Sequence, residues 1–376
     1  MAAVLVAALG FHVLAFLTYP PSDLYGYVRP WFRALAANGL AEPVGNYAPP
    51  YLYLLWALTL LDGLMYQILL IKLLSVFGAF WMAFAAARVL HALDAPRRLA
   101  LLTLALPSVI LNVSLLGQAD TFWIAPCLFA TAAAIEGRYA RVALWCGLAF
   151  AVKAQAAVFA PFVIYLFAWN RVPLRIWALA PVAFIAAWTP AWVAGWPLSY
   201  LTTIYLGQAD WMNADKTFFV GSGASLWTFF GFLAPQTAYD VRWLGLPLLL
   251  AGLAFYWRYL PRPTGRQMIM LAAIISAAGL PFLLPLVRER FFMLGDILAF
   301  LFAAAYPSQR TILLAVIVQV ASAFPMLVFA YALQPWDVLA PLLMAVALLG
   351  YLRAIDRRDP THSAKEGSGT PARATG

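Results

Sequence analysis

The stretch MYQILLIKLLSVFGAFWMAFAAARVL at residues 65–90 contains only two charged side chains, Lys72 and Arg88. A helix needs about 20 consecutive apolar residues, at about 1.5 Å of rise each, to cross the hydrocarbon core of a bilayer. Similar apolar stretches recur along the chain, so the sequence predicts an all-α membrane protein of about 12 spans, within a range of about 10–13. We place these spans near residues 2–19, 65–90, 99–112, 121–135, 141–152, 155–169, 174–194, 241–257, 267–287, 290–306, 311–333 and 336–352.

The overall composition supports a membrane protein before any motif is considered. Hydrophobic residues make up 65% of the chain and charged residues 10%, which leaves too little polar surface for a water-soluble domain. The net charge of +9 does not indicate a nucleic-acid partner, because the basic residues are scattered over short loops and do not alternate with aromatic residues. Cys127 and Cys146 both lie in apolar stretches, so we expect neither a disulfide nor a zinc site.

Basic residues are distributed unequally between the two sides of the predicted membrane. Alternating through the spans from a cytoplasmic N-terminus places most of the 24 Lys and Arg residues inside, as the positive-inside rule requires. The predicted inner residues are Arg88, Arg97, Arg98, Arg138, Arg141, Arg171, Arg175, Arg258, Arg262, Arg266, Arg310, Arg353, Arg357, Arg358, Lys365 and Arg373. The predicted outer residues are Arg29, Arg33, Lys153, Lys216, Arg288 and Arg290, with Lys72 and Arg242 left open. The C-terminus is then cytoplasmic and the working face is exoplasmic, and the Ala-rich composition with short loops suggests a bacterial plasma membrane.

The domain organisation is predicted to be simple. Residues 1–353 form one transmembrane domain, and residues 354–376, rich in Ser, Thr, Gly and Ala with mixed charge, form a disordered cytoplasmic tail. The first segment, 2–19, lacks the basic region and the small-residue cleavage site of a signal peptide, so we expect a retained helix.

Two segments between the spans, residues 20–64 and 195–240, are long enough to form exoplasmic loops around a site. In the first, Ser22 can cap a helix that Gly39 ends, and the aromatic residues between them follow helical spacing. This pattern predicts an amphipathic helix in the membrane interface, followed by a second short apolar helix at 51–61. The second loop carries Asp210, Asp215 and Lys216 and ends in a short apolar segment at 224–233.

Polar residues at the predicted outer surface need a reason, because charge at membrane depth costs several kcal/mol unless it is paired or reaches water. Asp23 follows the first span, where it is either a favourable charge at a helix N-terminus or a general base. No histidine lies on this face, so a carboxylate must carry any acid–base chemistry there. Three other outer turns carry Gln118 with Asp120, Lys153 with Gln155, and Arg288, Glu289 and Arg290 together. Each of these polar clusters alone could be a loop that reaches water. Three such clusters on one face favour binding of an anionic headgroup, since Arg and Lys both bind phosphate.

These residues lie in motifs that resemble those of the GT-C superfamily of polytopic glycosyltransferases, over residues 1–306. The resemblance is greatest to enzymes that use a polyprenyl-phosphate sugar, including the dolichyl-phosphate-glucose and dolichyl-phosphate-mannose users and their bacterial relatives. The matching motifs are Asp23, NYAPPYLYLLW at 46–56, LGQAD at 116–120, VKAQ at 152–155, GASLWTFFG at 223–231 and RERFFMLGD at 288–296.

The resemblance implies an inverting transfer of a sugar from a polyprenyl-phosphate donor to a lipid-linked or cell-envelope glycan acceptor at the exoplasmic surface. Asp23 would be the base, and Arg288, Arg290 and Lys153 would bind the donor phosphate. Where the family often has a His–Glu–Arg–Tyr-like run, this chain has Arg288 in place of the His, which implies charge neutralisation without proton transfer. The implied substrate-positioning residues are Tyr47, Gln118, Asp120, Gln155 and Glu289. No cofactor or metal is required, although Asp23 and Asp120 could approach each other, which leaves dependence on a divalent metal open.

Two other classes of protein also place polar residues in membrane spans. A transporter or lipid flippase is the main alternative, but its site usually lies near the bilayer midplane, often between repeated halves. The chain shows no convincing internal repeat, and its polar clusters fall at one surface. A scaffold subunit would leave Lys153 and the turn at 288–290 without a role. We therefore expect a membrane-embedded sugar transferase.

Overall fold

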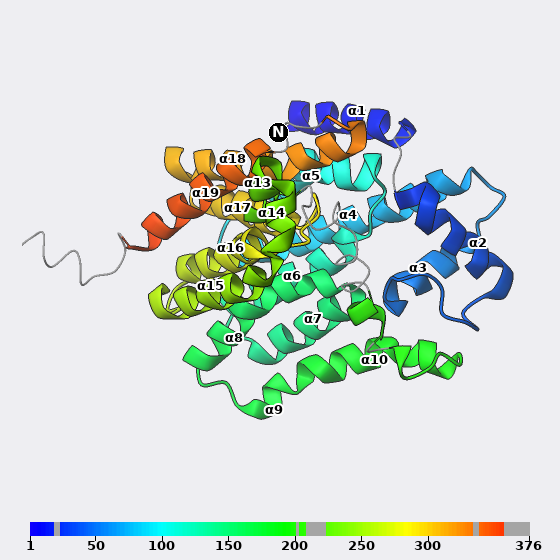
Figure 1. Ribbon diagram of the computed structural model, residues 1–376, viewed down its shortest axis with the longest axis horizontal. Helices are drawn as coiled ribbons and strands as arrows, with labels where there is room; N and C mark the ends of the chain where they lie inside the picture. Colours follow the sequence, from blue (N-terminus) through cyan, green and yellow to red (C-terminus); the bar gives the residue numbers. More distant parts are fainter. Residues whose placement is uncertain (19–22, 201–202, 208–222, 334–337, 357–376) are drawn as a thin grey trace, which may run out of the picture.

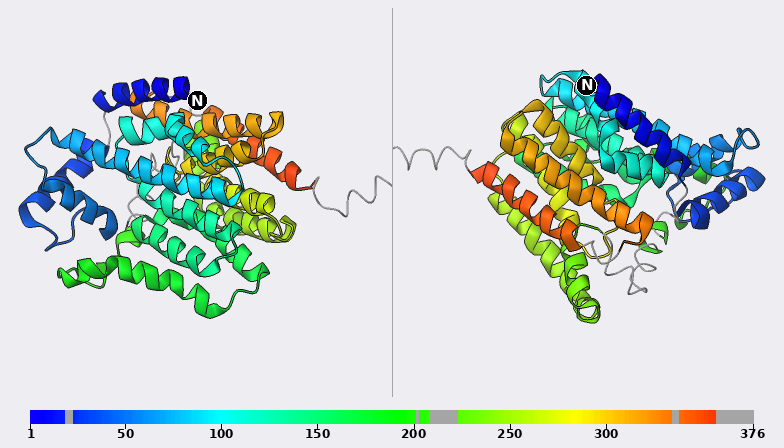
Figure 2. Two further views of the ribbon diagram at one scale, coloured as in Figure 1. Left: turned by 180° about the vertical axis from the view of Figure 1, so that it is seen from behind. Right: turned by 90° about the horizontal axis from the view of Figure 1, so that it is seen from above.

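The computed structural model is all-α and describes residues 1–18, 23–200, 203–207, 223–333 and 338–356. Figure 1 shows the longer helices lying side by side in a bundle, with the short helices α2 and α3 projecting from one end. Both views in Figure 2 agree that α19 leaves the bundle at the other end. The predicted Ser22 cap, Asp210, Asp215, Lys216 and tail residues 357–376 lie outside the described residues.

The helices follow the predicted apolar stretches closely. The first half contains α1 (Ala2–Leu17), η1 (Leu24–Val28), α2 (Arg29–Asn38), α3 (Pro49–Thr59), α4 (Gln67–Ala92), η2 (Arg97–Ala105), α5 (Pro107–Val109), η3 (Ile110–Leu115), α6 (Asp120–Ile135), α7 (Tyr139–Val152), η4 (Ala154–Phe159) and α8 (Ala160–Trp169). The second half contains α9 (Leu174–Trp177), α10 (Leu179–Val193), α13 (Leu226–Leu233), α14 (Pro235–Asp240), η5 (Arg242–Leu244), α15 (Gly245–Tyr259), α16 (Arg266–Leu283), α17 (Met293–Ala305), α18 (Gln309–Tyr331) and α19 (Leu339–Asp356). Helix α19 thus extends to Asp356, into the segment predicted as tail.

In the part of the chain that the structure describes, four helical segments are long and apolar enough to cross a membrane. They are Gln67–Ala92, Leu174–Val193, Arg266–Leu283 and Gln309–Tyr331. A fifth is added if the pair Arg97–Ala105 and Pro107–Leu115, bent by 57°, counts as one span. The structure therefore supports a multi-pass membrane protein, whereas six other apolar helices among the described residues have only 10–17 residues.

The predicted single span at 99–112 is wrong in one respect, because the structure divides it. Leu106 is extended, with φ −68° and ψ 131°, and it separates a 3₁₀ segment from α5. The cause is Pro107, which lacks a backbone N–H and disfavours the helical conformation of the preceding residue. This break places the following segment at the angle that leads to Gln118 and Asp120.

The loop between α1 and α4 contains the two predicted helices, as η1–α2 and α3, and their place in the membrane interface stays a prediction. Its η1–α2 segment buries Leu24, Val28, Phe32 and Leu35 on one face. Gly39 ends the helix with φ +62°, a conformation that glycine adopts without strain. The sequence pattern of the η1–α2 segment predicts which face is buried, because its buried side chains recur every three or four residues.

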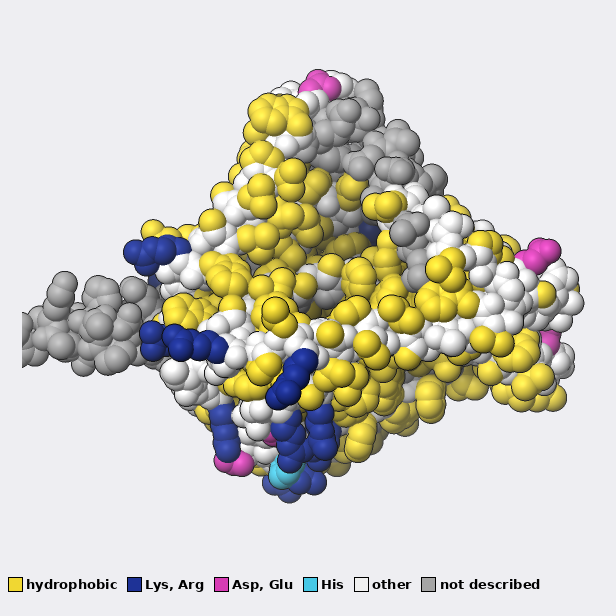
Figure 3. All heavy atoms as spheres, turned by 90° about the horizontal axis from the view of Figure 1, so that it is seen from below, with side chains coloured by type: hydrophobic (Ala, Val, Ile, Leu, Met, Phe, Trp, Pro, Cys, Tyr) yellow, Lys and Arg dark blue, Asp and Glu magenta, His cyan; other side chains and the backbone are white. Residues whose placement is uncertain are grey.

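Exposed apolar side chains cover much of the bundle. On α4, Phe77, Phe80 and Phe84 are all exposed and share one helical face. The face of the molecule in Figure 3 is largely apolar, and Lys and Arg side chains gather along its left and lower edges. Such a broad apolar surface is unfavourable in water but is what contact with lipid acyl chains requires.

Ion pairs join the loops at one end of the bundle. Arg88 at the end of α4 and Arg138 before α7 both pair with Glu136, at 3.6 Å and 3.1 Å. Asp94, in the loop that follows α4, pairs with Arg266 at the start of α16. The opposite ends of α6 and α7 carry Asp120 and Lys153, so these two residues are separated from the ion pairs by the length of the helices.

Candidate functional site

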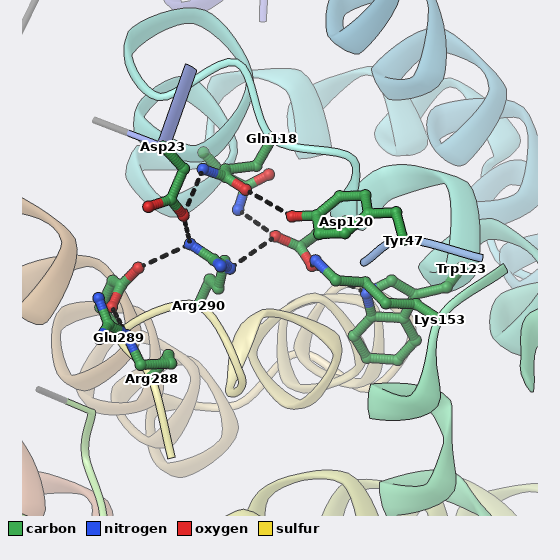
Figure 4. A network of polar contacts seen from close by, with 10 residues as sticks. Asp23, Tyr47, Gln118, Asp120, Trp123, Lys153, Arg288, Glu289 and Arg290 are labelled. Atoms are coloured by element: carbon green, nitrogen blue, oxygen red, sulfur yellow. Dashed lines mark hydrogen bonds and ion pairs between the residues drawn. The ribbon is translucent and has the colours of Figure 1, made fainter. Parts of the chain in front are cut away.

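Polar side chains from five distant segments meet at the end of the bundle near α2 and α3 (Figure 4). Every contributing segment is a helix end or a loop: Asp23 precedes η1, Tyr47 precedes α3, Gln118 and Asp120 lead into α6, Lys153 follows α7, and residues 288–290 precede α17. Hydrogen bonds and ion pairs join these eight side chains to one another and to Asn112 and Trp123, and we call these ten residues the polar network. The network therefore lies at a bundle end and not halfway along the helices.

Arg290 is the centre of the polar network. Its Nη1 donates to Oδ2 of Asp23 at 3.1 Å and to Oε1 of Glu289 at 2.9 Å. Its Nε lies 3.7 Å from Oδ2 of Asp120, an ion-pair distance without a hydrogen bond. One guanidinium thus contacts all three carboxylates, and the positive charge of Arg290 is shared among them (Figure 4).

Asp120 is fully buried and binds basic and neutral donors together. Lys153 Nζ lies 2.7 Å from Oδ1, and the indole N–H of Trp123 donates to the same oxygen at 3.0 Å. The Asn112 amide donates to Oδ2 at 2.9 Å. A carboxylate without exposure requires such partners, because burial of an unpaired charge is costly. Asp120 therefore fixes Lys153 in place.

The sequence did not identify Asn112 and Trp123 as members of the polar network. Asn112 is an amide inside a predicted apolar span, and polar residues in spans usually have a specific partner, so this signal was available. Trp123 lies three residues after Asp120, a spacing at which helical side chains are neighbours. Its aromatic character alone gave no reason to assign it to a polar site.

Asp23 is the accessible carboxylate of the polar network. Its side chain is 25% exposed, whereas those of Asp120 and Glu289 are 0% exposed. Burial by itself would raise the pKa of the Asp23 carboxyl, but Arg290, Arg288, a hydrogen bond from Arg290 and Lys153 together lower this pKa below its ordinary value. The carboxylate is therefore ionised at neutral pH and faces three positive charges.

Gln118 and Tyr47 connect Asp23 to the rest of the site. The Gln118 amide donates to Oδ2 of Asp23 at 3.5 Å, and the Tyr47 hydroxyl donates to the Gln118 carbonyl oxygen at 3.4 Å. The Tyr47 ring also lies beneath Lys153, with Nζ 5.0 Å from the ring centroid. These long contacts orient the side chains without saturating their hydrogen-bonding groups.

Arg288 occupies the edge of the polar network. Its Nε donates to Oε2 of Glu289 at 3.1 Å, and its guanidinium carbon lies 5.2 Å from the centroid of the Phe329 ring on α18. Glu289 thus binds Arg288 with one oxygen and Arg290 with the other. This buried carboxylate holds two basic groups side by side.

The structure unites all the predicted site residues except one. Gln155 lies on η4, two residues after Lys153, but its buried Oε1 has no hydrogen-bond partner among the described residues. Asp296, the last residue of the RERFFMLGD motif, is buried in α17 beside the Ser108 and Ser322 hydroxyls, and no described contact joins it to the polar network. Gln155 remains a predicted substrate contact.

Lys72 lies in the apolar helix α4, and its ammonium group binds the C-terminal end of α1. Its Nζ donates to the carbonyl oxygens of Ala15, Phe16 and Thr18 at 3.2, 3.1 and 2.6 Å. These contacts satisfy carbonyls that a helix C-terminus leaves without partners and place a positive charge at the negative end of the helix. Since Thr18 is five residues before Asp23, Lys72 anchors the chain just ahead of that carboxylate.

A metal site was left open by the sequence. Within the part of the chain that the structure describes, no group of three or more His, Cys, Asp or Glu side chains is arranged to hold a metal ion. Arg290 lies between Asp23 and Asp120, so these two carboxylates share a cation of the protein itself. That no metal is required stays a prediction.

Comparison with known proteins assigns no family, because no protein-family model and no curated protein sequence matches the chain. The resemblance in the sequence motifs therefore remains a prediction.

Proposed function

We propose that the chain is an inverting glycosyltransferase that moves a monosaccharide from a polyprenyl-phosphate donor to a lipid-linked or cell-envelope glycan acceptor. The observation that carries this proposal is the arrangement of one accessible carboxylate, Asp23, beside Arg290, Arg288 and Lys153. A base must reach the acceptor hydroxyl, and a phosphate leaving group needs positive charge, so both requirements meet at one place.

The buried carboxylates have a supporting role in this proposal. Asp120 and Glu289 are fully buried and hold Lys153, Arg288 and Arg290 by ion pairs. We assign them to positioning these basic side chains and not to direct contact with substrate. Positive charges that are held in place before the reaction stabilise a developing negative charge without reorganisation.

The membrane topology belongs to the same proposal. We infer that the shorter apolar helices also cross the bilayer, to give about 12 spans. The polar network then faces the exoplasm and the opposite end, with the Arg88, Arg138 and Arg266 ion pairs, faces the cytoplasm of a bacterial cell.

The donor chain requires an apolar site within reach of Lys153. A pocket of about 520 Å³ lies between α6, α7, α8 and α10 and is lined by Cys127, Ala143, Phe150, Ala157 and Phe184 among others. Ala156 and Ala157 of its lining lie on η4, three and four residues after Lys153. We assign this pocket to part of the polyprenyl chain.

The proposal is tested with purified protein in liposomes that contain a panel of polyprenyl-phosphate sugars and extracted cell-envelope glycans, with products identified by mass spectrometry. Asp23→Asn is the matched variant, because the amide keeps the shape but cannot accept the proton. Its transfer should fall by about 100-fold or more.

The transporter or flippase alternative makes a different prediction. It requires movement of a labelled lipid or solute across the liposome membrane in the absence of any acceptor. Such movement, together with no sugar transfer from any donor in the panel, would reject the transferase.

A further inference from the structure

The charges of the polar network cancel. Asp23, Asp120 and Glu289 stand against Arg288, Arg290 and Lys153, and each carboxylate is within 4 Å of at least one basic group. An incoming phosphate therefore does not enter a site of excess positive charge. It must share basic groups that already have carboxylate partners.

The group at the centre of this competition is Arg290, which contacts all three carboxylates. Among the described residues it donates two hydrogen bonds, both from Nη1, to Asp23 and Glu289. A guanidinium carries five N–H groups, so others remain for a phosphate. Glu289 and Asp120 are fully buried partners of Arg290, whereas the Asp23 side chain is 25% exposed. A phosphate that approaches from solvent thus meets Asp23 as its competitor.

We propose that Arg290 restrains Asp23 while the site is empty, and that the donor phosphate, by sharing this guanidinium, turns Asp23 into a stronger base. This inference rests on the proposed function and adds that donor binding activates the base.

The physical basis is the electrostatic environment of the Asp23 carboxylate. Arg290, Arg288 and Lys153 lower its pKa in the empty site, against the opposing effect of burial. The charged and polar groups that face it are these three, the Gln118 amide, and the carboxylates of Glu289 and Asp120 across Arg290. A negative phosphate on Arg290 weakens the stabilisation of the carboxylate, and a stronger base accepts a proton more readily.

The charges also balance during the reaction. The acceptor O–H bond breaks and its proton goes to Asp23, while the acceptor oxygen forms a bond to the anomeric carbon. The bond from that carbon to the phosphate oxygen breaks, and its electron pair stays on the phosphate, which gains one negative charge. Asp23 loses one negative charge in the same step. Arg290 therefore exchanges a carboxylate that has become neutral for a phosphate that has become more negative.

The test compares two pH profiles of the wild-type enzyme. The acid limb of kcat/KM for the donor reports the base in the free enzyme, and the acid limb of kcat reports it in the substrate complex. The pKa from kcat should exceed the pKa from kcat/KM by about 1 unit or more, because an adjacent opposite charge shifts a carboxyl pKa by about 1–3 units.

Variants then locate the cause. Arg290→Gln should raise the pKa seen in kcat/KM and close the gap between the two profiles, whereas Arg290→Lys, which keeps the charge, should retain part of the gap. Arg33→Gln is the matched control, since this residue is bonded to Gln67 and lies outside the polar network. It should leave the gap unchanged.

The outcomes separate the inference from the function. Robust transfer with coincident acid limbs in the wild type, or an unchanged gap in a folded Arg290→Gln, overturns the activation by donor and leaves the transferase standing. Because the first comparison needs no variant, failure of Arg290→Gln to fold does not remove the test. Absence of transfer from every donor overturns both proposals.

Discussion

Replacing either member of the buried Lys153–Asp120 pair should destabilise the protein strongly. Replacing both should lower the free energy of unfolding by less than the sum of the two single losses. The two side chains are 12% and 0% exposed, and Nζ lies 2.7 Å from Oδ1. Removing one partner from a buried pair leaves an uncompensated charge and typically costs about 3–5 kcal/mol. Asp120→Asn and Lys153→Met should each lower the free energy of unfolding by about 3 kcal/mol or more.

The double variant measures the interaction itself. Asp120→Asn with Lys153→Met removes both charges, so its loss should fall short of the sum by a coupling energy of about 1–3 kcal/mol. The matched control is the Asp94–Arg266 pair, whose side chains are 74% and 47% exposed. Its double-mutant cycle should show coupling close to zero, because solvent screens exposed pairs.

The assay is SDS-induced unfolding in mixed micelles, followed by far-ultraviolet circular dichroism, for the wild type, the single variants and the double variants. Strictly additive losses at Lys153 and Asp120 would refute the reasoning, because the polar network would then not hold its basic groups through buried charge. Equal coupling in the buried and the exposed pairs would refute it as well.

Three further predictions concern topology, the phosphate partner and the end of α1. Cysteines introduced at Glu42 and Arg97, both exposed, should react with a membrane-impermeant reagent from opposite sides, and labelling from the same side would exclude the proposed topology. Arg288→Ala should lower turnover strongly and Arg288→Lys less; in Arg288→His, transfer should rise as pH falls toward about 6, since imidazole has an unperturbed pKa of about 6.5. Equal pH profiles for Arg288→His and wild type would show that other residues hold the phosphate. Lys72→Met should lower the free energy of unfolding by about 1.5–3 kcal/mol through lost charge-assisted hydrogen bonds, with a smaller loss for Lys72→Arg, and unchanged stability would argue against its role at α1.

The apolar pattern of the sequence was enough to predict a membrane protein and the positions of most helices. Apolar length predicts helices because a bilayer requires internal hydrogen bonding, and this requirement acts on each segment alone. Local signals also sufficed for the η1–α2 segment, where a recurring apolar face precedes Gly39. At 99–112 the local signal for a break, Pro107, was present but was not applied, whereas the number of spans depends on how the helices sit in the bilayer.

Which polar groups touch, and which of them reach solvent, became clear only from the packing of the helices. Asp23 and Arg290 are 267 residues apart, and no local pattern specifies their 3.1 Å contact. The sequence placed three carboxylates on one face and singled out Asp23 as the base through a resemblance, whereas packing shows that Asp120 and Glu289 are buried and that Asp23 is accessible. Burial and charge pairing are sums over neighbours from the whole chain, so side-chain roles emerge only when the helices are packed together.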